Sequence, residues 1–145
     1  MNKVLKSIAV LFTNLIICIG AGHGFGPMFL LELFCLEELL SFNNSPDSFY
    51  TTLPKFSLAN SYEDMIVFFI LFSAIGQVVF LFSYVKFFKI KLKRLVRFIG
   101  ISVMLFGFFL ITKNLFNDGL AVFTFVTGIP FLCFVFLEIK SFSNE

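Results

Sequence analysis

The stretch Gly20-Ala21-Gly22-His23-Gly24-Phe25-Gly26-Pro27 holds four glycines and the chain's only histidine, and lies between two apolar segments, residues 8–19 and 28–40. Glycines four residues apart let a neighbouring helix approach closely within lipid. The same glycines lower helix propensity by about 1 kcal/mol each, whereas proline suits the first turn of a helix. The stretch therefore predicts either a helix-packing seam at Gly20, Gly22, Gly24 and Gly26, or a break between two helices.

The composition is that of a membrane protein. The 145 residues are 59% hydrophobic and 14% charged, with a mean hydropathy of +0.98, which lies far outside globular averages. Long apolar runs predict a single integral membrane domain. The net charge of +2 gives no reason to expect a nucleic-acid partner. The three cysteines, Cys18, Cys35 and Cys133, lie in apolar segments without a C-x-x-C motif, so we expect buried, inert thiols and no cofactor.

Four apolar segments predict transmembrane helices at about residues 4–22, 65–85, 95–112 and 120–139. Tyr62 and Tyr84 flank the second segment, about 33 Å apart on a helix, as interfacial aromatic residues do. Asn14 and Gln77 lie within the first two segments, where a polar side chain seeks an interhelical partner, so we expect them to pack together. The first segment also has features of a secretory signal peptide, although Ile17 stands where a lipoprotein signal has a small residue.

Residues 27–40 form an apolar segment that is too short to span a bilayer. We expect a short interfacial or re-entrant helix on the outer side, with a kinked extension of the first helix as the alternative. Turn-forming residues then predict an outer loop over residues 41–62. The expected fold is all-α, an integral membrane four-helix bundle with this additional short helix.

Charge predicts the topology. With the amino terminus in the cytoplasm, nine of the eleven basic residues lie inside and seven of the nine acidic residues lie outside. Both termini are then cytoplasmic, and the composition favours a bacterial inner membrane. The basic residues expected to face lipid headgroups are Lys86, Lys89, Lys91, Lys93, Arg94 and Arg97.

His23 and Glu32 form the candidate functional site. Ionisable residues within a membrane segment are functional candidates, and His23 near the outer face could carry a proton or contact a ligand with Glu32 as its partner. The alternative is a neutral histidine in a helix crossing and a glutamate that points outward. A lone histidine does not indicate a metal site, and the sequence contains no phosphate-binding loop or nucleophile motif, so no residue is predicted to be catalytic.

The layout resembles small four-helix bacterial membrane proteins of the DoxX-like kind. The resemblance rests on the glycine-rich stretch Gly20–Pro27, the basic segment Lys86–Arg97 and the tight turn Asn117-Asp118-Gly119. It covers the whole chain as an architecture. It implies a membrane role, sometimes linked to redox chemistry, and no catalytic residue.

Three functions are consistent with these features. The first is a non-enzymatic accessory, immunity or partner-binding protein that acts through its outer segment, residues 25–64. The second is an oligomeric transporter or channel subunit with Asn14, His23, Glu32 and Gln77 along a polar path. The third is a membrane enzyme that uses His23 and Glu32. The partners expected are the lipid bilayer and either another protein or further copies of this chain.

Overall fold

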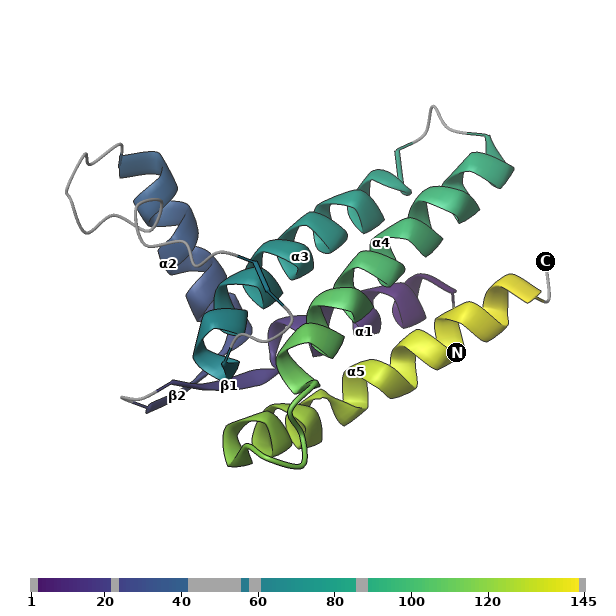
Figure 1. Ribbon diagram of the computed structural model, residues 1–145. Coiled ribbons are helices and arrows are strands. Elements are labelled where there is room, and N and C mark those ends of the chain that lie inside the picture. The colour runs from purple at the N-terminus through teal and green to yellow at the C-terminus, as the bar shows by residue number, and fades with distance from the viewer. Residues whose placement is uncertain (1–2, 22–23, 42–55, 58–60, 86–88, 144–145) are drawn as a thin grey trace.

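The computed structural model describes residues 3–21, 24–41, 56–57, 61–85 and 89–143, which form five helices and one β-hairpin (Figure 1). The elements are α1 (Lys3–Leu15), β1 (Cys18–Ala21), β2 (Gly24–Pro27), α2 (Met28–Ser41), α3 (Tyr62–Phe82), α4 (Ile90–Thr112) and α5 (Gly119–Ser143). Within these ranges α3, α4 and most of α5 are long and apolar enough to cross a membrane. The expectation of a mostly helical chain with membrane-length helices is therefore confirmed.

The first helix is shorter than predicted. α1 ends at Leu15 after 13 residues, about 20 Å, whereas the hydrocarbon core of a bilayer is about 30 Å thick. The predicted transmembrane helix over residues 4–22 is therefore wrong, and the described residues contain three membrane-length helices and not four. β-Branched isoleucines and glycine, which are poor helix formers, occupy the residues after Leu15, and the chain becomes extended there.

The glycine-rich stretch forms an antiparallel β-hairpin. Ile19 lies opposite Gly26 and Gly20 opposite Phe25. Gly24 has φ 154°, in the range that favours glycine. An added Cβ at Gly24 or Gly26 would meet nothing within 4 Å, so the predicted helix-packing role of these two glycines is wrong. Gly20 alone among the described glycines of this stretch is tightly packed, because a Cβ there would lie 2.7 Å from Leu120 Cδ2.

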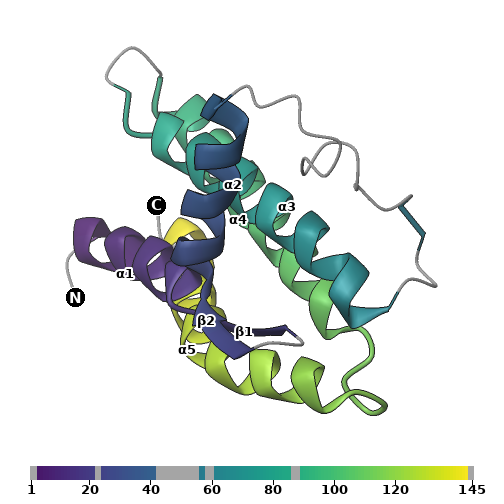
Figure 2. The ribbon, with the colours of Figure 1, turned by 90° about the vertical axis from the view of Figure 1, so that its left-hand side faces the viewer.

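The glycine-mediated helix crossing lies instead between α3 and α4, which run antiparallel and side by side (Figures 1 and 2). A Cβ on Gly76 would lie 2.8 Å from the carbonyl oxygen of Gly100, and a Cβ on Gly100 would lie 2.8 Å from the carbonyl oxygen of Gly76. Further along α4, a Cβ on Gly107 would lie 3.0 Å from Phe72 Cβ. Small residues at these positions let the two backbones approach closely.

The other elements differ in how closely they pack against α3 and α4. α1 and the hairpin lie along α5, and the buried core joins them to α3 and α4 (Figure 2). Its largest fully buried side chains include Phe69, Phe80, Phe131, Ile17, Ile19, Met28 and Met104. α2 begins one residue after its predicted start and diverges from the other helices (Figures 1 and 2). Leu33, Phe34 and Leu36 on α2 are each more than half exposed, as expected for side chains that contact lipid or another protein.

Candidate functional site

A polar network joins α1, α3 and α2 in the interior. Asn14 is fully buried, and its Oδ1 atom accepts hydrogen bonds from Ser73 Oγ at 2.6 Å and from Gln77 Nε2 at 2.8 Å. The structure therefore contains the contact between Asn14 and Gln77 that the sequence led us to expect. Asn14 Nδ2 is buried and has no hydrogen-bond partner in the described part of the chain.

Glu32 extends this network to α2. Gln77 Nε2 also donates a hydrogen bond of 2.9 Å to Glu32 Oε1. Gln77 lies fifteen residues beyond Tyr62 on α3, about 22 Å along the helix axis. Glu32 therefore contacts α3 well inside the membrane-length helix and closer to its carboxyl end.

Glu32 and Gln77 form the polar part of an open groove of about 350 Å³ between α2 and α3. Its other walls are apolar, formed by Leu15, Phe29, Leu33, Leu36, Ala74 and Val78. The groove thus presents an ionisable carboxyl and an amide to whatever lies between its apolar walls.

A second polar group holds the hairpin in place. The backbone N–H of Cys18 donates to Thr127 Oγ1 at 3.1 Å, and that of Gly20 donates to the Tyr62 hydroxyl at 3.3 Å. Tyr62 is 3% exposed, and its hydroxyl lies 2.6 Å from Thr124 Oγ1. These side chains satisfy strand N–H groups that lipid could not. Sequence reasoning treated Tyr62 as an interfacial aromatic residue and missed this role, although Thr124 and Thr127 share one face of α5.

A third polar group joins the ends of four helices. Glu138 on α5 is 1% exposed, accepts a hydrogen bond of 2.8 Å from Ser7 on α1, and forms an ion pair of 3.2 Å with Arg97 on α4. Arg97 Nε also donates to Ser83 Oγ at 3.4 Å, and its guanidinium lies 5.0 Å from the centre of the Tyr84 ring. Arg97, expected to face headgroups, thus has protein partners. The signal that could have revealed the pair is an acidic residue in the apolar segment of α5.

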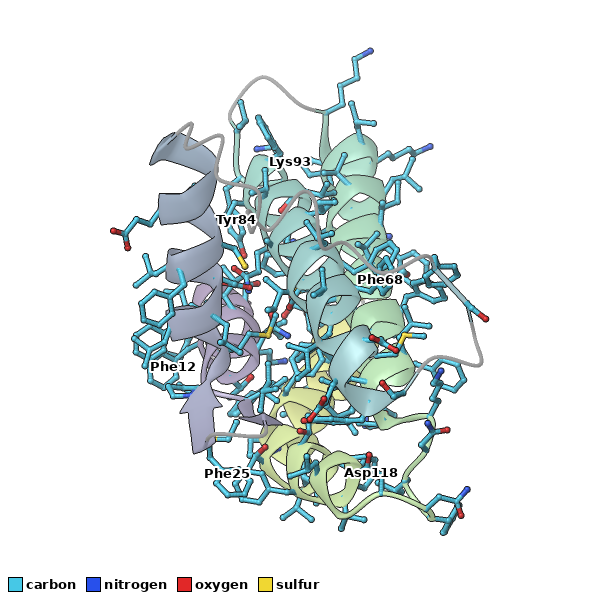
Figure 3. All side chains as sticks on the ribbon, turned by 60° about the vertical axis from the view of Figure 1, so that its left-hand side comes forward. Phe12, Phe25, Phe68, Tyr84, Lys93 and Asp118 are labelled. Carbon is cyan, nitrogen blue, oxygen red and sulfur yellow. The ribbon has the colours of Figure 1, made fainter. Side chains whose placement is uncertain are left out.

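The basic residues at the start of α4 and at the end of α5 lie at the same end of the molecule. Lys93 on α4 lies toward the end of the molecule opposite Asp118 (Figure 3). Lys89, Lys91, Lys93 and Arg94 stand at the start of α4, and Lys140 lies in the last turn of α5. Lys86, Gly22 and His23 lie outside the described residues, so the pairing of His23 with Glu32 stays a prediction. Among the described residues, no group of three His, Cys, Asp or Glu side chains could hold a metal ion.

Comparison of the chain with protein families, with curated proteins and with solved structures finds no match in any of the three. The resemblance to DoxX-like proteins therefore stays a prediction. The function has to be argued from the groove between α2 and α3 and from the polar groups around it.

Proposed function

We propose that this chain is a non-enzymatic accessory protein of a membrane that binds a transmembrane helix of a partner protein in the groove between α2 and α3. The observation that carries the proposal is the carboxyl of Glu32 hydrogen-bonded to Gln77 in an open, apolar groove. Polar and ionisable groups at membrane depth are costly when they face acyl chains, and they are usually paired. A partner helix that brings a hydrogen-bond donor would supply such a pair.

The shape and composition of the groove support this class of partner. Its leucine, phenylalanine and valine walls match the side chains of a lipid-exposed helix, and Ala74 leaves room for a close approach. A volume of about 350 Å³ lies at the low end of ligand pockets and suits a few side chains of a helix. α2 belongs to residues 25–64, the segment expected from the sequence to contact a partner. A serine, threonine, asparagine or basic residue on the partner would complete the network.

The proposal includes the orientation predicted from charge, with both termini in the cytoplasm of a bacterial cell. It is supported by Ser7, Ser83, Arg97 and Glu138, whose contacts bring together the ends of the helices that carry most of the basic residues. Basic residues collect on the cytoplasmic side of membrane proteins. In this orientation the groove opens within the bilayer.

Site-specific photo-crosslinking in native membranes tests the proposal. A photoreactive residue at Leu33 or Leu36, which line the groove, should give one discrete protein adduct. The same residue at Ile75 or Phe136, which are exposed on α3 and α5 outside the groove, should not give that adduct. Glu32→Gln, which keeps the shape of the side chain, should reduce the adduct at Leu33. Equal adducts at all four positions, or lipid adducts alone, would refute the proposal.

A second candidate is an oligomeric transporter or channel subunit. The observation in its favour is that one network runs from the buried amide of Asn14 through Gln77 to the Glu32 carboxyl in the open groove. An adduct of twice the mass of the chain, together with ion or proton flux in liposomes that Glu32→Gln abolishes, would favour this candidate over a partner protein. An enzyme that uses His23 and Glu32 ranks third.

A further inference from the structure

A second hollow lies between α4 and α5 and shares no lining residue with the groove. It has a volume of about 390 Å³, is open, and is lined by Lys91, Arg94, Leu95, Phe98 and Ile139. The four α4 residues are spaced at i, i+3, i+4 and i+7, so they share one face of the helix. Ile139 on α5 closes the side of the hollow.

The lining changes from basic to apolar along α4. Lys91 and Arg94 lie in the first turns of the helix, and Phe98 lies seven residues beyond Lys91, about 10 Å further along the axis. Leu95 is 54% exposed and Phe98 is 48% exposed, so protein does not cover this face. Among the described residues that line the hollow, Lys91 and Arg94 carry the charge and both are basic. Glu138, the residue before Ile139, is buried and pairs with Arg97. The hollow is thus complementary to an amphiphile that has an anionic head and an apolar tail.

We propose that this hollow binds one anionic phospholipid molecule. Its phosphate lies between Lys91 and Arg94, and one acyl chain runs along Leu95, Phe98 and Ile139. Arginine binds phosphate oxygens through a planar fork of donors, and lysine adds a compact positive charge. Basic pockets beside transmembrane helices on the cytoplasmic side bind anionic headgroups in this way. A zwitterionic lipid is disfavoured because its own ammonium group would face the two basic side chains.

The choice of lipid over a soluble anion follows from the apolar half of the hollow. A free phosphate would use the two basic side chains and leave Leu95 and Phe98 exposed. A phospholipid covers both halves, and burial of apolar surface adds to the electrostatic attraction. The proposal does not depend on the partner helix, since the hollow and the groove between α2 and α3 share no residue.

Native mass spectrometry of the full chain, released from nanodiscs of phosphatidylglycerol mixed equally with phosphatidylcholine, tests the proposal. The wild-type chain should retain one phosphatidylglycerol at least tenfold more often than phosphatidylcholine. Lys91→Gln together with Arg94→Gln should reduce this preference to less than threefold. A control, Lys93→Gln with Lys140→Gln, removes the same charge outside the hollow and should leave the preference within twofold of wild type.

Two further measurements keep the test decisive. If the double variant does not fold, Lys91→Gln alone and Leu95→Ala alone replace it, and each should lower the preference at least threefold. Inorganic phosphate at ten times the lipid concentration should not displace the bound lipid. Equal losses in the hollow and control variants would show that general charge attraction accounts for the binding and would overturn the proposal. So would displacement by phosphate, or a wild-type chain without preference.

Discussion

Gly76 and Gly100 face each other across α3 and α4 so closely that a Cβ on either one would lie 2.8 Å from the carbonyl oxygen of the other. This reciprocal close approach fixes where α3 and α4 cross. It also sets the place of Gln77, the residue after Gly76, which hydrogen-bonds to both Asn14 and Glu32. The position of the groove between α2 and α3 therefore depends on this crossing.

Gly100→Ala should destabilise the protein. Alanine normally favours a helix over glycine by about 1 kcal/mol, but here the new methyl group would lie 2.7 Å from the backbone nitrogen of Phe80. We expect a net loss of about 1–3 kcal/mol, the usual cost of overpacking. Equilibrium unfolding in detergent measures it. Gly26→Ala, where the methyl group meets nothing within 4 Å, is the control and should change stability little. A stabilised Gly100→Ala would contradict the crossing.

Tyr62→Phe should loosen the hairpin. The substitution removes the hydroxyl that accepts the N–H of Gly20 and contacts Thr124, and leaves a buried donor without a partner. Such a loss costs about 1–3 kcal/mol. Hydrogen exchange should show faster exchange at the Gly20 amide. Tyr84→Phe, which changes a half-exposed ring and keeps its face toward Arg97, serves as the control. Unchanged protection of Gly20 in Tyr62→Phe would contradict the bond.

Replacing Arg97 alone should destabilise the protein more than replacing Arg97 and Glu138 together. Arg97→Met leaves a carboxylate that is 1% exposed without its counter-ion, and should cost roughly 3 kcal/mol. The double variant Arg97→Met with Glu138→Leu leaves no unpaired charge and should recover at least half of that loss. Equilibrium unfolding of the three proteins gives the coupling. Additive losses would show that the two side chains act independently.

Reporter fusions test the orientation. Fusions after Phe88 and Glu145 should report the cytoplasm, and a fusion after Asp47 should report the outer side, because basic residues are retained inside. Two enzymatic reporters are used, one active only in the cytoplasm and one active only outside it, so that each location gives a positive signal. A cytoplasmic signal at Asp47 would overturn the proposed orientation. It would also overturn the placement of the bound phospholipid in the cytoplasmic leaflet.

The amino-acid sequence alone determined the class of protein and its long helices. α3, α4 and α5 each contain an apolar segment of membrane length, and such length is a local property that composition reveals. Asn14 and Gln77 could be matched for a similar reason, since each is a polar side chain within an apolar segment and needs a partner. The start of α2 followed from Pro27, which cannot continue a preceding helix but suits the start of a new one.

Only the tertiary structure decided what the glycine-rich stretch became. Its composition left open a packing seam or a break between two helices and did not predict a β-hairpin. The strand N–H groups are satisfied by Thr127 and Tyr62, which are far away in the sequence. The same holds for Glu32 with Gln77 and for Arg97 with Glu138, which are 45 and 41 residues apart. A sequence shows that a buried polar group must have a partner, whereas the packing of distant helices selects which one it has.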